Sequence, residues 1–389
     1  MNFLENIRVV EISHMVMGPS TGVILGDLGA HVVKVEPLGG DKTRRLQGSG
    51  AGYFSMFNRN KQSICLDLLH ATGQMIMRRL VETSDVFIEN FRPGALDTYR
   101  LGYDEVSQIN PNIIYQSSKG FLSGPYAQRT ALDEVAQMMG GLAYMTGPAG
   151  RPLRAGSSVV DITGGMFGVI GILAALLKRE QSGQGGAHIS SSLFESVLFL
   201  VGQHIAQHAA TGTAPDPMPA RVSAWAIYDV FNTRDGQVFV AVVSDRQWSV
   251  FCEFFGFTDW LSDPNLVSNS ERVARRDEIL PIVRSRFCQM TVAELTSRLT
   301  AADLPFAPIN RPQDLLEDPH VQANGLFDIK LPDQNCSAQL PKLPIEVNGQ
   351  RPKVAQSPPR VGENTGAILS ALGYSNNDIS IWRKQGVVG

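Results

Sequence analysis

The stretch IRVVEISHMVMGPSTGVILGDLGAHVVKVEP, residues 7–37, decides the fold class of this sequence. It begins with a β-branched, apolar run at 7–13, continues with small and apolar residues at 18–30, and closes with a second β-branched run at 31–37 that Pro37 ends. The two runs predict strands, and the small-residue segment between them predicts a helix. The stretch therefore predicts a unit of strand, helix and strand.

The same order of elements recurs along the first 125 residues. Helix signals at 77–84 and 101–111 are each followed by a strand signal, at 85–91 and 112–120. Repeated units of this kind require a parallel sheet covered by helices, because parallel neighbours need crossover connections. We therefore predict an α/β chain with a Rossmann-like large domain. A dinucleotide site is not favoured, because the loop after the first strand lacks the GxGxxG pattern.

Length and proline content predict the domain organisation. The chain has 389 residues, more than one hydrophobic core usually serves, so we expect two domains. The predicted parts are the N-terminal part of the large domain at 1–210, a linker at 211–224, a small α+β domain at 225–310, a second linker at 311–324 and a C-terminal segment at 325–389. The small domain is expected to open with a hairpin whose turn lies at Asp235 and Gly236.

Composition argues against several classes of partner. The chain is 43% hydrophobic and 18% charged, with a formal net charge of −3 and no dense cluster of Lys and Arg. This balance argues against nucleic acid or an anionic membrane surface as the main partner. The apolar run from Met166 to Leu177 is shorter than the roughly 20 residues that span a bilayer, so we expect a buried helix there and no membrane partner.

Cysteine usage and the first residues of the chain favour a cytoplasmic protein. The four cysteines are far apart, form no CxxC pair and have no histidine at metal-ligand spacing. We therefore expect reduced thiols and no metal site. Residues 1–13 contain neither a basic region nor a cleavage site, so no signal peptide is expected.

Asp161 stands out because it is a carboxylate in an otherwise apolar stretch, RAGSSVVDITGGMFGVIGILAALLKRE at 154–180. Removing a carboxylate from water without partners is costly or shifts its pKa. One interpretation is a helix N-cap, a position that Asp favours. The other is a nucleophile presented at the start of a helix, where Gly164 and Gly165 allow a bulky substrate to approach the backbone.

Five segments of the chain, taken together, resemble the class III CoA-transferase family, whose members include formyl-CoA transferase and crotonobetainyl-CoA:carnitine CoA-transferase. These segments are VVEISHMVMGPSTGVILGDLGAHVVKVEP at 9–37, VFIENFRPGALDTYRLGYDEV at 86–106, LDEVAQMMGG at 132–141, VVDITGG at 159–165 and PPRVGENTGAILSALGY at 358–374. The resemblance implies an interlocked homodimer of ring-shaped subunits. It also implies that both chain ends build the large domain, with the segment at 325–389 completing it.

The resemblance implies an enzyme that moves CoA from an acyl-CoA donor to a carboxylic acid acceptor. Asp161 matches the family's nucleophile, which forms a mixed anhydride and then an aspartyl-CoA thioester. Coenzyme A enters as a substrate, so no permanently bound cofactor and no metal are implied. Gly164 and Gly165 are expected to leave backbone N–H groups open for an oxyanion, and Asp133 matches an acidic residue near the nucleophile. The positions that match CoA contacts are His14, Val16, Leu66, Asn90, Phe91 and Arg100.

Structural roles stay open for some of these residues. His14 is equally a loop histidine with a structural hydrogen bond, and Asp133 is equally the cap of the helix that follows it. Val16 stands where formyl-CoA transferase has a glutamine, and RVSAWAIYD at 221–229 stands where it has a glycine-rich loop, so neither formate nor oxalate is predicted as substrate. Pro37 replaces a basic residue that contacts CoA there, so that contact is not expected here. The candidates for holding a second carboxylate are Arg154, Arg221 and Arg246.

Two alternatives come from other classes of protein. A 2-methylacyl-CoA racemase shares the fold that the resemblance implies but uses a histidine where this sequence has Leu132, which argues against it. A non-catalytic CoA-binding scaffold has no need of Asp161 beside two glycines. Transfer of CoA between two carboxyl groups of one acid is a third possibility within the transferase reaction. Donor and acceptor are not predicted.

Overall fold

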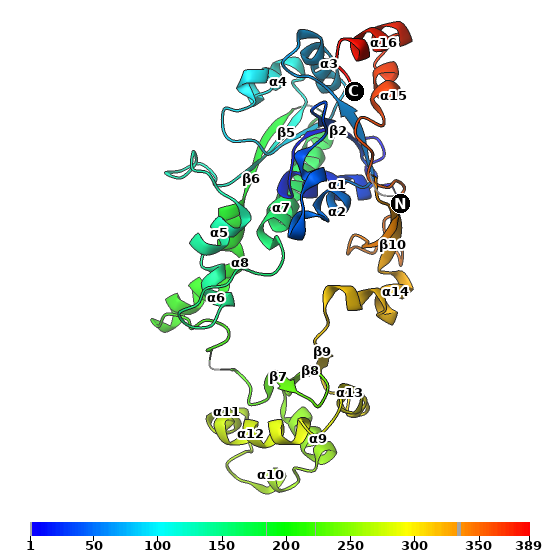
Figure 1. Ribbon diagram of the computed structural model, residues 1–389. Helices are drawn as coiled ribbons and strands as arrows, with labels where there is room; N and C mark the ends of the chain where they lie inside the picture. Colours follow the sequence, from blue (N-terminus) through cyan, green and yellow to red (C-terminus); the bar gives the residue numbers. More distant parts are fainter. Residues whose placement is uncertain (1, 184, 222, 333–335) are drawn as a thin grey trace. The chain divides into compact units, whose positions relative to one another are not determined.

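The structure is a computed structural model that describes residues 2–183, 185–221, 223–332 and 336–389 (Figure 1). Residue 222 of the predicted linker at 211–224 and residues 333–335 of the C-terminal segment therefore lie outside the described residues. The chain divides into two compact units. The first consists of Met1–Ala220 and Asn324–Gly389, and the second of Arg221–Ala323.

A six-stranded parallel sheet forms the centre of the first unit. Its strands are β1 (Arg8–Ile12), β2 (His31–Glu36), β3 (Lys61–Cys65), β4 (Val86–Glu89), β5 (Ile114–Lys119) and β6 (Ala187–Ser192). They lie in the order β3-β2-β1-β4-β5-β6, and every neighbouring pair is parallel. The predicted α/β class with a parallel central sheet is confirmed. Strand β3, with the mostly polar sequence KQSIC, was not predicted, because an alternating pattern of this length is weak without its neighbours.

Helices cover both faces of this sheet. The helices and 3₁₀ turns up to the end of β6 and just beyond are α1 (Met17–Asp27), η1 (Lys42–Arg45), η2 (Gly48–Gly50), α2 (Tyr53–Phe57), α3 (Ala71–Glu82), η3 (Asp97–Tyr99), α4 (Tyr103–Ile109), α5 (Asp133–Met139), α6 (Leu142–Thr146), α7 (Val159–Ser182) and α8 (Leu193–Thr211). The C-terminal segment adds an antiparallel hairpin and two helices: β10 (Leu326–Lys330), β11 (Ser337–Pro341), α15 (Thr365–Ala371) and α16 (Asn376–Lys384).

Successive side chains of a strand point to opposite faces of the sheet. The cluster in which each side chain packs therefore shows which helices cover each face. Val9 and Ile88 pack in a cluster with Leu25 of α1 and Val169 of α7. The neighbouring Val10 lies in a second cluster that includes residues of α3, α4, α15 and α16. Figure 1 shows α1 beside α7, and α3 and α4 near the C-terminal helices. The C-terminal helices therefore belong to the core built by the first strands.

The second unit is a small α+β body with its own core. Its elements are β7 (Tyr228–Asn232), β8 (Gln237–Ala241), α9 (Asp245–Phe255), α10 (Asp259–Ser262), α11 (Asn269–Ala274), α12 (Arg276–Phe287), α13 (Val292–Ala301), β9 (Phe306–Pro308) and η4 (Pro312–Leu316), with α14 (Pro319–Asn324) at its end. Strands β7 and β8 pair antiparallel around the turn at Asp235 and Gly236, as the sequence predicts. The segment predicted as a linker at 311–324 contains η4 and α14.

Helix α7 differs from the expectation of a short, buried helix. It has 24 residues, because it begins before Met166 and ends after Leu177. By length and composition it is able to cross a membrane, and 33% of its most apolar window is buried within the described chain. The helix is thus longer than predicted, and in the described chain it is only partly buried, against α1, α5, α8 and the sheet. Length and composition alone are weak evidence for a membrane span, because core helices of soluble proteins meet the same criterion.

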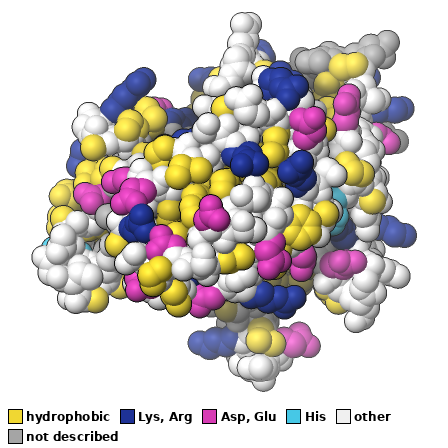
Figure 2. Space-filling view, turned by 90° about the horizontal axis from the view of Figure 1, so that it is seen from below, with side chains coloured by type: hydrophobic (Ala, Val, Ile, Leu, Met, Phe, Trp, Pro, Cys, Tyr) yellow, Lys and Arg dark blue, Asp and Glu magenta, His cyan; other side chains and the backbone are white. Residues whose placement is uncertain are grey.

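Surface charge is mixed on the face that Figure 2 presents. Lys and Arg side chains lie among Asp and Glu side chains there, with hydrophobic side chains between them. This pattern agrees with the small formal net charge of −3. A face of this kind attracts neither sign of partner over a long range.

Candidate functional site

Two loops at the carboxyl ends of β1 and β4 hold each other in place. The backbone N–H of His14 donates to Asn90 Oδ1 at 3.0 Å, and Asn90 Nδ2 donates to the His14 carbonyl at 2.6 Å. The rings of His14 and Phe91 meet edge to face with 5.3 Å between their centroids. Three of the residues predicted from the sequence are thus brought together. This end of a parallel sheet is where α/β proteins commonly bind ligands.

Asp161 lies in the first turn of α7, and its carboxylate does not cap that helix. The N-cap position is Ser158, whose side chain makes no cap hydrogen bond. Asp133 Oδ2, from the start of α5, accepts the N–H groups of Val160 at 2.9 Å and Asp161 at 3.1 Å. Asp133 therefore caps α7 from outside, and not the helix that follows it. Among the described residues, no hydrogen bond reaches the Asp161 carboxylate, which leaves it available to a substrate.

A small polar cluster fixes the cap itself. Gln137, wholly buried, donates from Nε2 to Asp133 Oδ1 at 2.6 Å and accepts the Ala155 N–H at Oε1 at 2.8 Å. Arg154 Nη2 lies 3.6 Å from the same Asp133 oxygen. These contacts hold the segment before α7 against α5. The helix therefore starts at a defined place, and Asp161 is presented from it.

The surroundings make Asp161 a weaker acid than an ordinary aspartate. The pKa of Asp161 is raised to about 7, mainly by burial and also by the nearby charge of Asp133, against the opposing charge of Arg154. At neutral pH the carboxyl group is then present in both forms. A partly buried carboxylate without hydrogen-bond donors is a poorly solvated nucleophile, and its raised pKa marks it as a candidate functional residue.

The two glycines after Asp161 have a different role from the one expected. Gly164 and Gly165 are buried within α7, beyond its first turn, so their amides belong to the helical hydrogen-bond ladder and are not open to an oxyanion. A Cβ added at Gly165 would lie 2.7 Å from Ser20 Cβ, and one at Gly164 would lie 2.5 Å from Met17 Cε. The glycines thus let α1 and α7 cross closely.

The crossing of α1 and α7 brings the loop after β1 near the start of α7. Val16 packs in one apolar cluster with Ile162, and Met17 packs in another with Val160. Val16 is 1% exposed, so its side chain is part of the core. The preceding residue, Met15, is 40% exposed and faces outward instead. The loop therefore offers His14 and Met15 at the surface.

Two other residues expected to contact CoA lie apart from this cluster. Leu66 follows β3 with its side chain in the core and its backbone bridged to Val388, so a side-chain contact with a ligand is excluded. Arg100 is exposed and follows η3 with a left-handed backbone. Of the three arginines considered for a second carboxylate, Arg154 belongs to the same unit as Asp161, whereas Arg221 and Arg246 belong to the second unit.

A group of buried charged side chains beneath the loop after β1 was not predicted from the sequence. Lys34 and Glu11 are fully buried in the middle of β2 and β1, and Asp41 and Thr43 follow β2. On β5, Lys119 Nζ donates to the carbonyl of Phe91 at 2.9 Å. The signal was available in the sequence, because Lys34 interrupts the apolar run HVVKVEP and Glu11 interrupts VVEIS.

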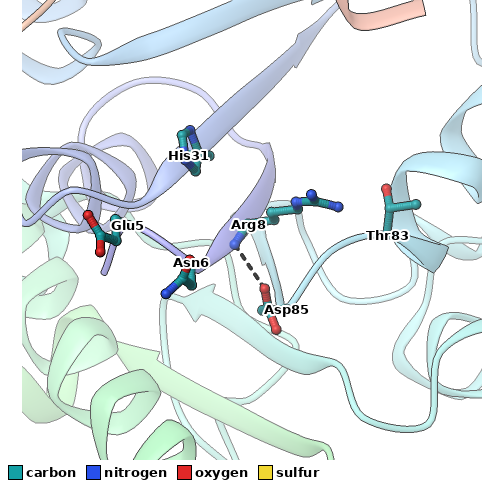
Figure 3. Close-up of a pocket in the computed structure, with 6 residues that line it drawn as sticks. All are labelled: Glu5, Asn6, Arg8, His31, Thr83 and Asp85. Atoms are coloured by element: carbon teal, nitrogen blue, oxygen red, sulfur yellow. Dashed lines mark hydrogen bonds between the residues drawn. The ribbon is translucent and has the colours of Figure 1, made fainter. Parts of the chain in front are cut away.

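A cavity of about 580 Å³ lies at the other end of the sheet. Figure 3 shows its lining residues, among them Arg8, His31 and Asp85, at the amino ends of β1, β2 and β4, with the Arg8 backbone N–H bonded to Asp85. In a parallel sheet the amino ends are remote from the loops that carry His14 and Asn90. This cavity is therefore not part of the candidate site.

Comparisons with known proteins show the family of the chain. The family model described as "CoA-transferase family III" matches residues 4–365. The chain is 33% identical to a succinate–glutarate CoA-transferase of Agrobacterium fabrum, over 95% of each chain. It is 32% identical to an acetyl-CoA:oxalate CoA-transferase of Acetobacter aceti, over 94% of each. A crystal structure of a CAIB/BAIF family protein from Brucella suis is similar with a TM-score of 0.84 and 33% identity, over 95% of this chain and 98% of that one.

Proposed function

Because the chain belongs to CoA-transferase family III, we propose that it transfers CoA from an acyl-CoA donor to a carboxylic acid, with Asp161 as the nucleophile. The observation that carries this proposal is the Asp161 carboxylate itself. It lies at the start of α7 with its backbone held by Asp133 and with no hydrogen bond from the described residues. The backbone of Asp161 is thus fixed, while its carboxylate is left without a hydrogen bond from the described residues.

The reaction runs through two exchanges at Asp161. The carboxylate attacks the acyl-CoA carbonyl, which forms a mixed anhydride and releases CoA thiolate. The thiolate attacks the aspartyl carbonyl of the anhydride, which forms an aspartyl-CoA thioester and releases the donor acid. The acceptor carboxylate then attacks the thioester, and the thiolate attacks the acceptor carbonyl of the new anhydride. Asp161 is regenerated, and no ATP, metal or resident cofactor is consumed.

The loop that carries His14 and Met15, together with Asn90 and Phe91, is proposed to contact CoA. Support comes from the mutual hydrogen bonds of His14 and Asn90 and from the packing of Val16 and Met17 against the start of α7. Arg100, exposed beyond β4, is proposed to meet the phosphates of CoA, since a guanidinium pairs well with phosphate oxygens.

The acceptor is proposed to be a dicarboxylic acid. Relatives of this chain are named for glutarate and for oxalate. Arg154 supports the proposal, because its charge is already felt by Asp161 and its guanidinium is partly exposed. Initial rates with a series of straight-chain dicarboxylic acids and their monocarboxylic counterparts test it. A preference for monocarboxylic acids would contradict it.

Trapping of the covalent intermediate tests the mechanism. Hydroxylamine added during turnover should convert the aspartyl thioester to a hydroxamate on the peptide that contains Asp161, and borohydride should reduce it to the alcohol. Asp161→Asn should abolish both the adduct and the transfer of CoA, while the protein stays folded. An adduct on Asp133 would move the nucleophile, and transfer without any adduct would refute the covalent route. Exchange of the α-proton of a 2-methylacyl-CoA with deuterated water would instead indicate the racemase.

A homodimer is part of the same proposal. Four large apolar side chains at helical spacing on α7 are exposed: Met166, Ile170, Leu173 and Leu177. On α8, Phe199 is 73% exposed and its ring meets that of Phe167. Contiguous apolar surface of this kind marks an interaction site, and a second copy of the chain is the proposed occupant. Interlocked rings, as the family resemblance implies, are the proposed arrangement.

Two measurements test the dimer. Light scattering should give twice the chain mass of 42.4 kDa, and Phe199→Glu should lower it, whereas Leu69→Glu, equally exposed at 73%, should not. Interlocked rings exchange subunits only when a chain unfolds. Differently tagged dimers mixed under native conditions should therefore stay unmixed, and mix after unfolding and refolding. Rapid exchange would refute the interlocked arrangement and leave a simple dimer.

A further inference from the structure

Side chains hold the loop between β1 and α1 at four of its backbone groups. Lys34 Nζ donates to the Ser13 carbonyl at 2.7 Å, and Thr43 Oγ1 accepts the Met15 N–H at 3.0 Å. Between them, the N–H and the carbonyl of His14 are both bonded to Asn90. The loop belongs to no helix or strand, so these three side chains determine its path.

That path includes a strained residue. Met15 has a φ of 63°, in the left-handed region that L-residues with a side chain rarely adopt. Such a conformation costs on the order of 1 kcal/mol and persists only where its surroundings hold it. Here it turns Met15 outward, to 40% exposure, and lets the next residue, Val16, enter the core. The hydrogen bond from Met15 N–H to Thr43 fixes the strained residue directly.

The residues that hold the loop are linked by a row of buried alternating charges. Lys61 Nζ lies 2.7 Å from Glu11 Oε2, and Lys34 Nζ lies 3.4 Å from Glu11 Oε1 and 3.1 Å from Asp41 Oδ2. Asp41 Oδ1 accepts both the N–H and the hydroxyl of Thr43, at 2.9 Å and 2.8 Å. All these charged side chains are at most 4% exposed. The row therefore runs from β3 through β1 and β2 to Thr43.

The row favours one orientation of Thr43. Its hydroxyl donates to Asp41 Oδ1 at 2.8 Å, a shorter contact than the 3.9 Å to Met15 Sδ, and its oxygen accepts the Met15 N–H. Lys34 is likewise held from several sides, because its ammonium donates to the Ser13 carbonyl and to Glu11 Oε1 and forms an ion pair with Asp41. Burial alone would lower the pKa of Lys34, but the carboxylates of Glu11 and Asp41 outweigh it and raise that pKa, so the ammonium stays charged.

Stability alone does not account for this arrangement. Burying several charges has a desolvation cost that their mutual attraction often fails to exceed, and well-packed apolar residues in their place are often equally stable or more so. The charges instead orient two hydrogen-bonding groups, the Lys34 ammonium toward the Ser13 carbonyl and the Thr43 hydroxyl oxygen toward the Met15 N–H. We propose that Lys34 and Thr43 are positioning residues for CoA transfer, which act by holding His14 and Met15 in the loop that meets acyl-CoA.

This inference rests on the proposed function for its kinetic readout only. Thr43→Val keeps the shape of the side chain but removes the hydroxyl, and Thr43→Ser restores it. Thr365→Val is a matched control, because Thr365 is also fully buried and its Oγ1 also accepts a backbone N–H, that of Cys65 at 3.2 Å, away from the loop. Lys34→Met is a second test at the other end of the loop, made on the protein if it stays folded.

Two measurements are made on each variant: kcat/KM for acyl-CoA and hydrogen exchange of the peptide that covers residues 13–17. Thr43→Val should lower kcat/KM at least tenfold and accelerate exchange in that peptide, whereas Thr43→Ser and Thr365→Val should stay within about threefold of the wild type in both. Lys34→Met should act in the same direction as Thr43→Val.

Several outcomes would overturn the inference. Wild-type kinetics in Thr43→Val would show that the loop position does not matter to the reaction, whatever the exchange data say. Slow kinetics with unchanged exchange would show that Thr43 acts by another route. An equal loss in Thr365→Val would reduce the effect to general destabilisation. If the wild type transfers no CoA, the proposed function fails, and unchanged exchange in Thr43→Val would separately refute the positioning role.

Discussion

We expect the activity to fall as the pH drops below about 7, and the position of that fall to move in opposite directions in two variants beside Asp161. Asp161, the proposed nucleophile, must be ionised to react, and its pKa is raised to about 7 by burial and by Asp133 against the opposing effect of Arg154. Asp133→Asn removes a negative charge and should move the acidic limb of kcat/KM to lower pH. Arg154→Gln removes a positive charge and should move it to higher pH.

The magnitude follows from the ionised fraction of Asp161. With a pKa of about 7, kcat/KM at pH 6 should be about one tenth of its plateau, and at pH 5 about one hundredth. An aspartate at its usual pKa would give a flat profile over that range. Each substitution removes one partly screened charge interaction of ~0.7 kcal/mol, which corresponds to a displacement of about 0.5 pH unit. The two limbs should therefore lie about one pH unit apart.

The assay is a series of initial rates from pH 5 to 9 at constant ionic strength, with an acceptor acid that stays ionised throughout. Circular dichroism at each pH confirms that the variants are folded. Glu134→Gln is the control, because Glu134 neighbours Asp133 and lies 3.7 Å from Arg154 but is 58% exposed at its side chain. Its limb should coincide with that of the wild type. Displacement of both limbs in the same direction, or an acidic limb below pH 5 in the wild type, would refute the reasoning.

Three further predictions concern stability. Gly165→Ala should lower the free energy of unfolding by ~1–3 kcal/mol, because the new Cβ would lie 2.7 Å from a side-chain atom of α1, whereas Gly52→Ala, with no atom within 4 Å, should be nearly neutral in the same denaturant titration. Arg59→Met should cost ~3–5 kcal/mol by leaving Asp27 buried without its partner at 2.6 Å, which a fall in Tm would reveal. Asp161→Asn should raise Tm by an amount that grows between pH 4 and 7. Folding raises the pKa of Asp161, so the wild type loses stability as the pH rises through about 7, whereas the asparagine does not titrate. The upper limit of this difference is ~4 kcal/mol.

Local patterns in the sequence were sufficient for strands β1, β2, β4 and β5 of the sheet, but not for β3. The run at 7–13 is β1 (Arg8–Ile12), and the run at 31–37 is β2 (His31–Glu36). These strands are buried on both faces, so they read as nearly continuous apolar runs. The position of Asp161 at the start of a helix was also predicted, since the small and apolar residues around it have a clear helical character.

Contacts between distant segments were beyond such patterns. Asp133 looks like the cap of its own helix, yet its carboxylate caps α7, and only the packing of α5 against α7 determines which. Gly164 and Gly165 looked like open backbone beside a nucleophile, but the close crossing with α1 buries them. Val16 and Leu66 were predicted to contact CoA, but both side chains lie in the core. The sequence does not show which side chains at the end of a strand point to the surface and which point to the interior.

The apolar exterior of α7 has two physical explanations, and the contacts of the helix favour a protein partner over lipid. A membrane span needs its middle surrounded by lipid or by other spanning helices. The first turns of α7 are instead fixed to α5 by Asp133 and pressed against α1 at Gly164 and Gly165. Its last turn is fixed to the sheet, where Arg179 Nη2 lies 2.7 Å from Asp85 Oδ1. A helix bound along its length to a parallel sheet of the same unit has no orientation in which its free side alone enters a bilayer core. Protein surface of matching shape covers such a side well, and the proposed second copy would also keep water away from the anhydride proposed at Asp161.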